Sequence, residues 1–180
     1  MENLNRRVSA YRVGLDLYLP YLYEAKKRRS YDDLICADVR WLPIRPGSFD
    51  GVLCSQVIEH LSKDEGLELV QEIEAISRLR VVIGTTIGYV PYLPLDQNNN
   101  SNPFQVHKSG WAPETFYLMG YHVRFQGLKL AYGPRGFMRK VPRFLRPLLG
   151  LIPYVIAPII YFSSRLAIYQ VAHKDVQKNS

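Results

Sequence analysis

The chain has 180 residues, which suffices for a single domain with a sizeable hydrophobic core. A hydrophobic content of 47% and 13 tyrosines exclude an intrinsically disordered chain. The formal net charge is +7, and the basic residues gather in clusters. The two cysteines, Cys36 and Cys54, lie in apolar stretches without a CxxC motif or a Cys/His cluster. We therefore expect both to be free, buried thiols, and the protein to be cytoplasmic, where thiols stay reduced.

Strand and helix patterns alternate through the first part of the chain. Residues 12–18 alternate between apolar and polar positions and predict a strand. Pro20 suits the first turn of a helix, which we expect to run to about Arg29. A second strand is predicted over residues 32–39, followed by a loop over residues 41–48.

The most informative stretch is residues 49–61, FDGVLCSQVIEHL. It begins with residues that are apolar on both faces, which predicts a central parallel strand with helices on both sides. Ser62 and Glu65 have the spacing of a capping box, and apolar residues then recur at helical spacing. In open parallel sheets, ligands bind at the carboxyl ends of the strands. The loop between this strand and helix is therefore a candidate site, and it carries Gln56, Glu59 and His60.

The remaining elements continue the alternation. Residues 80–86 predict a buried strand, and residues 88–103 form a long polar stretch typical of a lid, a binding loop or a mobile loop. A short helix is predicted over 113–118, then strands over 121–130 and 165–173. This order predicts an α/β fold with a doubly wound, mostly parallel sheet.

A basic cluster precedes an apolar segment, residues 144–162. The segment is too short and too often interrupted by proline for a membrane span, which needs about 20 apolar residues. With the basic cluster ahead of it, the segment has the character of an interfacial element on an anionic membrane surface. A hydrophobic cover over a substrate pocket and a homodimer interface are the alternatives. The cluster consists of Arg135, Arg139, Lys140, Arg143 and Arg146.

The run LICADVRWLPIRPGSFDGVLCSQVIEHL resembles the middle of class I S-adenosylmethionine-dependent methyltransferases, in particular the type 11 group. Members commonly have an acid after the third strand, then LP, a turn, FD, a hydrophobic strand and EHL. The GLD at Gly14–Asp16 matches the family's second strand. The resemblance covers about residues 12–127 and returns at 167–174. It implies a Rossmann-like fold in which residues 1–180 are one domain, with 134–163 as a basic-hydrophobic insertion before an antiparallel last strand.

The resemblance implies S-adenosylmethionine as the cofactor and places its binding residues. Asp16 would accept hydrogen bonds from the ribose hydroxyls; the alternative is an aspartate that caps the following helix. Asp38 would bind the adenine amino group, with the backbone amide of Val39 at the ring; the alternative is an aspartate that forms a turn. The implied cofactor-binding residues are Asp16, Leu17, Asp38, Val39, Gln56 and Val57.

Glu59 and His60 are candidates for a general base, because histidine titrates near neutrality. Some quinone-biosynthesis O-methyltransferases have E-x-x-E-H here and bind a divalent ion. This chain has Gln56 in place of the first glutamate, and a hard cation prefers carboxylates, so we predict no metal site. In most type 11 members the pair orients the loop, which is the role we favour. His107 either faces substrate or lies on the surface, and no catalytic residue is assigned.

One part of the family pattern is missing. The family's first strand and its glycine-rich loop, D-x-G-x-G-x-G, should precede Arg12, but residues 1–11 do not supply them, and no GxGxxG occurs in the chain. We therefore expect the sheet to lack its central strand. The explanations are an N-terminally truncated fragment, which we favour, a degenerate inactive relative, or a site that another chain completes.

These observations predict an S-adenosylmethionine-dependent methyltransferase that acts on a small-molecule or lipid-like acceptor. The alternative is a catalytically inactive methyltransferase-like module that binds a partner or a membrane surface. A nucleotide-dependent oxidoreductase is a weaker reading, since the LP-to-FD spacing and the EHL ending do not fit it. The chain lacks the basic-aromatic stripe of single-strand nucleic-acid binders, so nucleic acid is not an expected partner.

Overall fold

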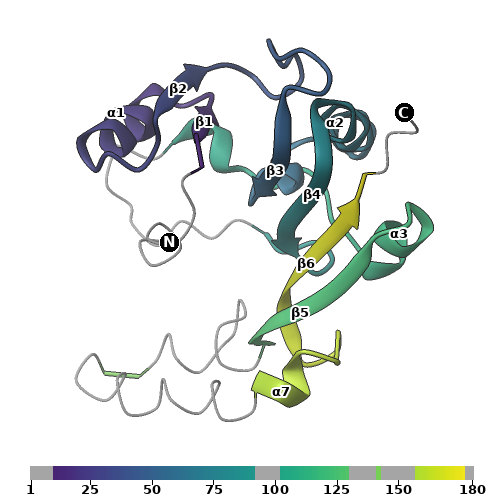
Figure 1. Cartoon of the computed structure of the whole chain (residues 1–180). Coiled ribbons are helices and arrows are strands. Elements are labelled where there is room, and N and C mark those ends of the chain that lie inside the picture. Colours follow the sequence, from purple (N-terminus) through teal and green to yellow (C-terminus); the bar gives the residue numbers. More distant parts are fainter. Residues whose placement is uncertain (1–9, 92–101, 130–140, 143–156, 177–180) are drawn as a thin grey trace. The chain divides into compact units, whose positions relative to one another are not determined.

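The computed structural model describes residues 10–91, 102–129, 141–142 and 157–176. The chain divides into two compact units, residues 1–44 and 45–180, which are described separately. Figure 1 shows their helices and strands along the chain.

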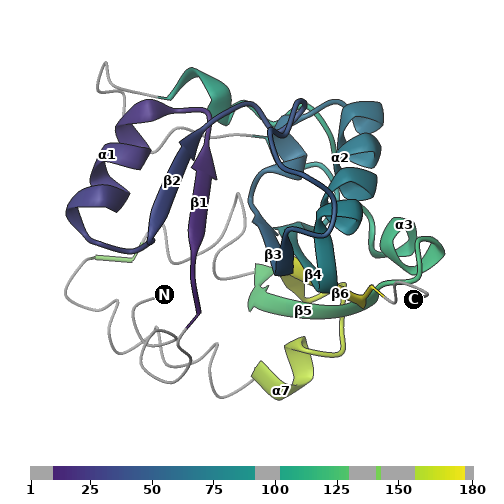
Figure 2. The same cartoon turned by 45° about the horizontal axis from the view of Figure 1, so that its top comes forward.

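The first unit is a strand–helix–strand motif. Strands β1 (Val13–Asp16) and β2 (Asp33–Cys36) pair in parallel, with Asp16 opposite Cys36. Helix α1 (Leu19–Lys27) connects them and packs on both strands (Figure 2). Pro20 lies in its first turn and two lysines in its last, where they complement the helix dipole. The predicted order of strand, helix and strand is confirmed, with shorter strands than expected.

The second unit contains a four-stranded sheet in the order β3-β4-β6-β5 (Figure 1). Strand β3 (Phe49–Ser55) runs parallel to β4 (Ser77–Thr86). Strand β6 (Ala167–Asp175) is antiparallel both to β4 and to β5 (His122–Leu128). The antiparallel last strand is therefore confirmed, and both units show the mixed α/β class predicted from the sequence.

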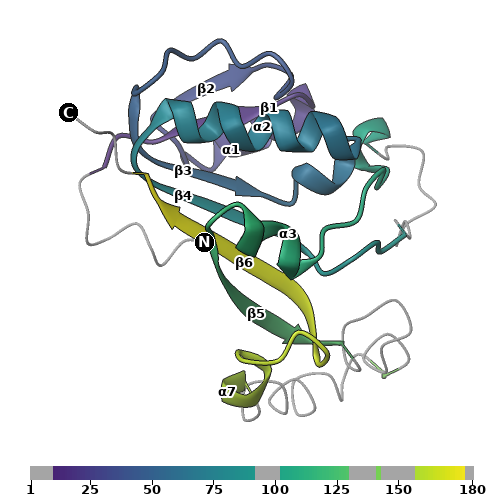
Figure 3. The same ribbon diagram turned by 90° about the vertical axis from the view of Figure 1, so that its right-hand side faces the viewer.

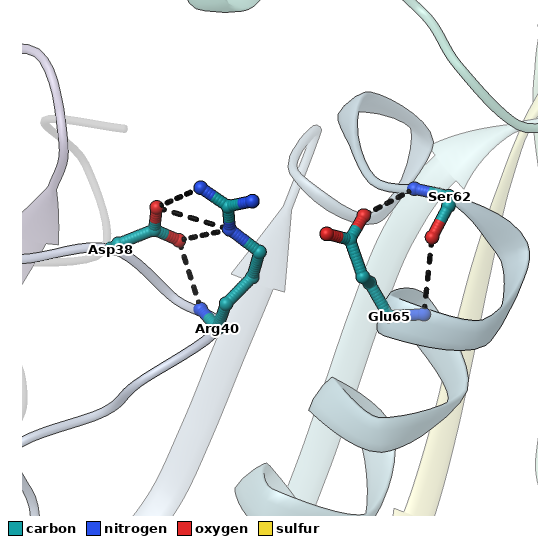
Figure 4. Close-up of polar contacts among 4 residues, drawn as sticks. All are labelled: Asp38, Arg40, Ser62 and Glu65. Carbon is teal, nitrogen blue, oxygen red and sulfur yellow. Dashed lines mark hydrogen bonds and ion pairs between the residues drawn. The ribbon is translucent and has the colours of Figure 1, made fainter.

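Helices α2 (Lys63–Ile76) and α3 (Pro113–Leu118) cover one face of this sheet, α2 on β3 and β4 and α3 on β5 (Figure 3). The capping box at the start of α2 is confirmed (Figure 4). The Ser62 hydroxyl accepts from the Glu65 amide at 3.3 Å, and the Glu65 carboxylate accepts from the Ser62 amide at 2.8 Å. Such a cap stabilises a helix by about 1 kcal/mol.

Strand β3 is not the covered, central strand that its apolar sequence predicts. In the described part of the chain it pairs with β4 only, and β1 and β2 form a separate sheet. Leu53 is 62% exposed, while its neighbour Cys54 is buried. Successive residues of a strand point to opposite faces of the sheet, so Leu53 lies on the face opposite to that of Cys54, and the described helices α2 and α3 cover only one of the two faces.

Trp111 is the centre of the core beneath α2. Its side chain is completely buried, and its indole N–H lies 2.9 Å from the Ser109 hydroxyl and 3.3 Å from the Ile58 carbonyl oxygen. Its own carbonyl oxygen accepts from the Gly88 amide at 2.8 Å and from the Gln170 side chain at 2.7 Å. One residue therefore joins the segment after β3 to the ends of β4 and β6.

Both cysteines are free, as expected, but only Cys54 is buried, and Cys36 is exposed at the end of β2. The expectation of two buried thiols is wrong for Cys36, which ends a four-residue strand that, in the described part of the chain, pairs with β1 alone. Burial, and to a lesser extent the nearby Glu59 carboxyl, raises the pKa of the Cys54 thiol to about 12.

We expect the two thiols to differ strongly in reactivity. With 5,5'-dithiobis(2-nitrobenzoic acid) at pH 8, Cys36 should react quickly, because its side chain is exposed. Cys54 should react only as fast as the protein opens, because its raised pKa leaves almost no thiolate at this pH. Cys36→Ser should remove the fast phase and leave the slow one. Two equally fast thiols in the folded protein would contradict this assignment.

The apolar segment at 144–162 falls largely outside the described residues, as do the basic positions 135, 139, 140, 143 and 146. Its described end contains the short helix α7 (Ala157–Ile160), which packs on β5 and buries Ile160. None of the helices in the described part of the chain has the length and apolar character needed to cross a membrane. Membrane-surface binding stays a prediction. Residues 92–101 of the long polar stretch also lie outside the described ranges.

Candidate functional site

In the first unit, the parallel pairing brings two predicted acids to one edge of the sheet. Asp16 ends β1, and Asp38 lies two residues beyond the end of β2. Because Asp16 is paired with Cys36, both acids lie at the carboxyl end of the strands, where ligands of parallel sheets bind. The neighbouring candidates Leu17 and Val39 are both partly exposed.

Asp16 has a local role in this structure. One of its carboxylate oxygens, Oδ1, accepts a hydrogen bond from the Tyr18 amide at 2.7 Å. Tyr18 is the residue that precedes the first turn of α1, and its own side chain makes no capping bond. Asp16 thus helps to start α1, which is the alternative considered above. The bond uses one carboxylate oxygen, so the ribose role stays a prediction.

The carboxylate of Asp38 forms a hydrogen bond and an ion pair with Arg40 (Figure 4). The Arg40 amide donates to Oδ1 at 3.0 Å, which is the turn-forming role considered from the sequence. The Arg40 guanidinium also forms an ion pair with the same carboxylate, with Nη2 2.6 Å from Oδ2. An adenine amino group would have to share this carboxylate with Arg40, and that role stays a prediction.

In the second unit, the candidates follow the carboxyl end of β3. Gln56 is exposed and has a φ of 55°, in the left-handed region, and its amide donates to the Gly84 carbonyl oxygen at 2.8 Å. A left-handed conformation is unfavourable for a residue with a side chain and is typical of sites where the chain direction is fixed by its surroundings. Val57 is partly buried. The turn at Gln56 leads the chain into the short 3-10 helix η2 (Ile58–His60).

Glu59 is completely buried within η2. Its Oε2 accepts a hydrogen bond from the Thr85 hydroxyl at 2.9 Å, and its backbone carbonyl oxygen accepts from the amides of Lys108 and Ser109. These contacts join the loop after β3 to β4 and to the segment before Trp111. The other carboxylate oxygen, Oε1, has no hydrogen-bond partner among the described residues.

His60 and His107 lie side by side, although they are far apart in the sequence. Their ring centroids are 4.9 Å apart, and the rings meet edge to face. The Nδ1 atom of His60 is 3.3 Å from the Val106 carbonyl oxygen, and Nδ1 of His107 is 2.6 Å from the Val90 carbonyl oxygen. Both side chains are partly buried. His107 is therefore not a simple surface residue, and its proximity to Glu59 and His60 has no signal in the sequence.

The chain is similar in sequence to one protein family and in structure to several solved proteins. Residues 1–79 match the family model described as a methyltransferase domain. No curated protein matches the chain. An Archaeoglobus fulgidus SAM-dependent methyltransferase superposes with a TM-score of 0.53 at 16% identity, covering 91% of this chain and 75% of its own.

Two further structures show the same similarity. A chain from the complex between the Haloferax volcanii Trm112 methyltransferase activator and a putative methyltransferase gives a TM-score of 0.59 at 15% identity, covering 99% of this chain and 77% of its own. The third structure is the Burkholderia thailandensis 1,6-didemethyltoxoflavin-N1-methyltransferase, solved with 1,6-didemethyltoxoflavin and S-adenosylhomocysteine. It superposes with a TM-score of 0.51 at 17% identity, covering 92% of this chain and 61% of its own. At such identities the superpositions establish the fold, which is Rossmann-like. The resemblance to a methyltransferase domain is borne out for the matched residues, 1–79.

Proposed function

We propose that this chain, whose residues 1–79 match the methyltransferase-domain family and whose fold is that of S-adenosylmethionine-dependent methyltransferases, binds S-adenosylmethionine and serves methyl transfer to a small molecule. The observation that carries the proposal is the family match itself. The matched residues include the three places where a parallel strand ends in a predicted cofactor-binding residue: Asp16, Asp38 and Gln56.

The cofactor supplies the chemistry in such a reaction. Its methyl group moves from the sulfonium sulfur to a nucleophilic atom of the acceptor, and the sulfur keeps the bonding electron pair as a neutral thioether. Because this leaving group is intrinsically good, the protein mainly has to bind and align the two molecules. Asp16 would hold the ribose hydroxyls with the carboxylate oxygen that the Tyr18 amide does not use.

A small-molecule acceptor is supported by the Burkholderia thailandensis structure, which binds one. A lipid-like acceptor is supported only by the sequence of the apolar segment at 144–162 and the basic cluster ahead of it. We also propose a cytoplasmic location, on the ground that the two cysteines are free.

The test is calorimetric titration of the folded chain with S-adenosylhomocysteine, using variants that separate ligand binding from the local role of Asp16. Asp16→Asn keeps an oxygen that can accept from the Tyr18 amide but removes the charge. Asp16→Ala removes both. We expect saturable binding by the unaltered chain, at least 10-fold weaker binding by Asp16→Asn, and no measurable binding by Asp16→Ala.

Asp32→Ala is the matched control. Asp32 also accepts a backbone hydrogen bond, from the Arg12 amide at 2.7 Å, but at the opposite end of the same two strands. Its substitution should leave the affinity unchanged. A folded chain without saturable binding, or equal losses in Asp16→Ala and Asp32→Ala, would overturn cofactor binding by this chain.

The second candidate is an inactive methyltransferase-like module that binds a partner or a membrane surface. The observation that favours it is the pairing of Asp38 with Arg40, which occupies the carboxylate expected to recognise adenine. This reading predicts a stable fold without cofactor affinity. A chain that fails to bind S-adenosylhomocysteine but floats with anionic vesicles would support it.

A further inference from the structure

Three side chains in the second unit place metal-binding atoms close together. One carboxylate oxygen of Glu59 and one ring nitrogen each of His60 and His107 lie within 4.8 Å of one another. We propose that Glu59, His60 and His107 bind one divalent transition-metal ion of the zinc class. The site uses other residues than the predicted cofactor contacts, although Gln56 and Val57 precede it in the same loop, and it does not depend on the proposed methyl transfer.

The first support is the unpaired oxygen of Glu59. The side chain is completely buried, and Thr85 donates only to Oε2, while no residue in the described part of the chain donates to Oε1. A buried acceptor without a hydrogen bond destabilises a fold by about 1–3 kcal/mol, so native proteins rarely keep one. A cation next to Oε1 would remove this penalty, and the nearby imidazole nitrogens are suitable ligands for the same ion.

The second support is the hydrogen bonding of the two imidazoles. In each ring, Nδ1 lies next to a backbone carbonyl oxygen, that of Val106 for His60 and that of Val90 for His107. Because a carbonyl oxygen only accepts, Nδ1 must carry the proton, and the lone pair of the neutral ring is then on Nε2. Metal-binding histidines are typically held by such a bond from the other ring nitrogen.

Binding of an ion requires the three ligand atoms to move closer together. Zinc binds imidazole nitrogen and carboxylate oxygen at about 2.0–2.2 Å, so two ligands of a tetrahedral ion lie about 3.4 Å apart. The ligand atoms here lie within 4.8 Å of one another and must therefore approach by up to about 1.4 Å. Rotation of the two partly buried imidazoles can supply this movement while Glu59 stays fixed by Thr85.

The chemical types of the three ligands indicate which metal ion the proposed site prefers. Two imidazoles and one carboxylate favour zinc and its first-row neighbours over magnesium and calcium, which prefer oxygen. Three protein ligands also leave a coordination position for water or a substrate. The prediction of no metal site rested on Gln56 replacing a carboxylate for a hard cation. His107 provides a different third ligand, from the segment before Trp111, and shifts the expected ion from a hard cation to zinc.

The test is zinc titration of the tag-free, chelator-treated chain, followed by calorimetry and by thermal unfolding. We expect one equivalent to bind saturably and to raise the melting temperature. His60→Ala, His107→Ala and Glu59→Gln should each weaken binding at least 10-fold; Glu59→Gln keeps an oxygen for the Thr85 hydroxyl. Cobalt in place of zinc should give visible absorption bands of a tetrahedral site without the ultraviolet bands of a thiolate ligand.

The chain contains a matched control pair. His122 and His173 lie opposite each other on β5 and β6, with ring centroids 5.5 Å apart, but they do not belong to the proposed site. The double variant His122→Ala, His173→Ala should bind zinc like the unaltered chain.

The outcomes separate the proposals. Absence of saturable zinc binding by the unaltered, folded chain would overturn the metal site even if a ligand variant failed to fold. Loss of binding in the His122/His173 double variant, with binding kept in His60→Ala, would also overturn it. Cofactor titration uses no zinc, so each of the two proposals can fail without the other.

Discussion

Replacing Trp111 by alanine is expected to destabilise the unit of residues 45–180 by about 3–5 kcal/mol. The indole is completely buried, and its N–H bonds and its contact with the Lys63 ammonium, 3.5 Å from the ring centroid, are all lost with it. Small proteins are stable by only about 5–15 kcal/mol, so this change removes a large share of the total. The measurement is urea unfolding followed by far-ultraviolet circular dichroism.

Trp41→Ala is the control, because Trp41 is the other tryptophan of the chain and is 72% exposed. Its main described contact is with the Arg40 guanidinium, 4.8 Å from the ring, and the expected loss is below about 1 kcal/mol. The loss of stability in Trp111→Phe should lie between those of Trp41→Ala and Trp111→Ala. Equal losses for Trp41→Ala and Trp111→Ala would show that Trp111 is not the centre of this core.

Gly66→Ala is expected to destabilise the same unit by about 1–3 kcal/mol, against the usual effect of this change. In an exposed helix interior, alanine is more favourable than glycine by about 1 kcal/mol. At Gly66 in α2, however, an added Cβ would lie 2.4 Å from Cζ2 of Trp111 and 3.1 Å from Cγ1 of Ile58. Since both neighbours are fully buried, neither can move away without disturbing the core.

The check is the same urea experiment, with Gln71→Ala at an exposed position of α2 as the control for helix propensity. That control should be neutral or slightly stabilising. Phenylalanine lacks Cζ2 of the indole, so Trp111→Phe should relieve part of the clash. The double variant is therefore expected to lose at least 0.5 kcal/mol less than the sum of its parts. Stabilisation by Gly66→Ala would contradict the packing described here.

The features that the sequence predicted well are those set by neighbouring residues. The capping box of Ser62 and Glu65 depends on spacing within one turn, and the strand–helix–strand of the first unit depends on local patterns and Pro20. The turn at Asp38 is equally local, because the Arg40 amide that donates to its carboxylate lies two residues along the chain, but the ion pair with the Arg40 side chain was not predicted. Whether Asp38 serves the turn or a cofactor is a question of ligands, which local patterns do not answer.

The features that the sequence did not predict arise between distant segments. The proximity of His60 and His107 depends on how the segment before Trp111 returns to η2, which the Glu59 carbonyl oxygen and the indole N–H fix. The exposure of Leu53 depends on whether a helix covers its face of the sheet, and the apolar periodicity of one strand does not contain this information. Sequence patterns therefore placed the elements, and tertiary contacts decided the site.

The open edge of β3 has a consequence for how the protein behaves at high concentration. Strand β3 has seven largely apolar residues and pairs with no other described strand on one side, and an unpaired edge of this kind can template intermolecular sheet growth. Its side chains include one acid, Asp50, whose exposed carboxylate pairs with Arg78 at 2.8 Å. A charge on an edge strand opposes stacking between molecules. We therefore expect Asp50 to contribute to the solubility of the chain independently of the free energy of folding.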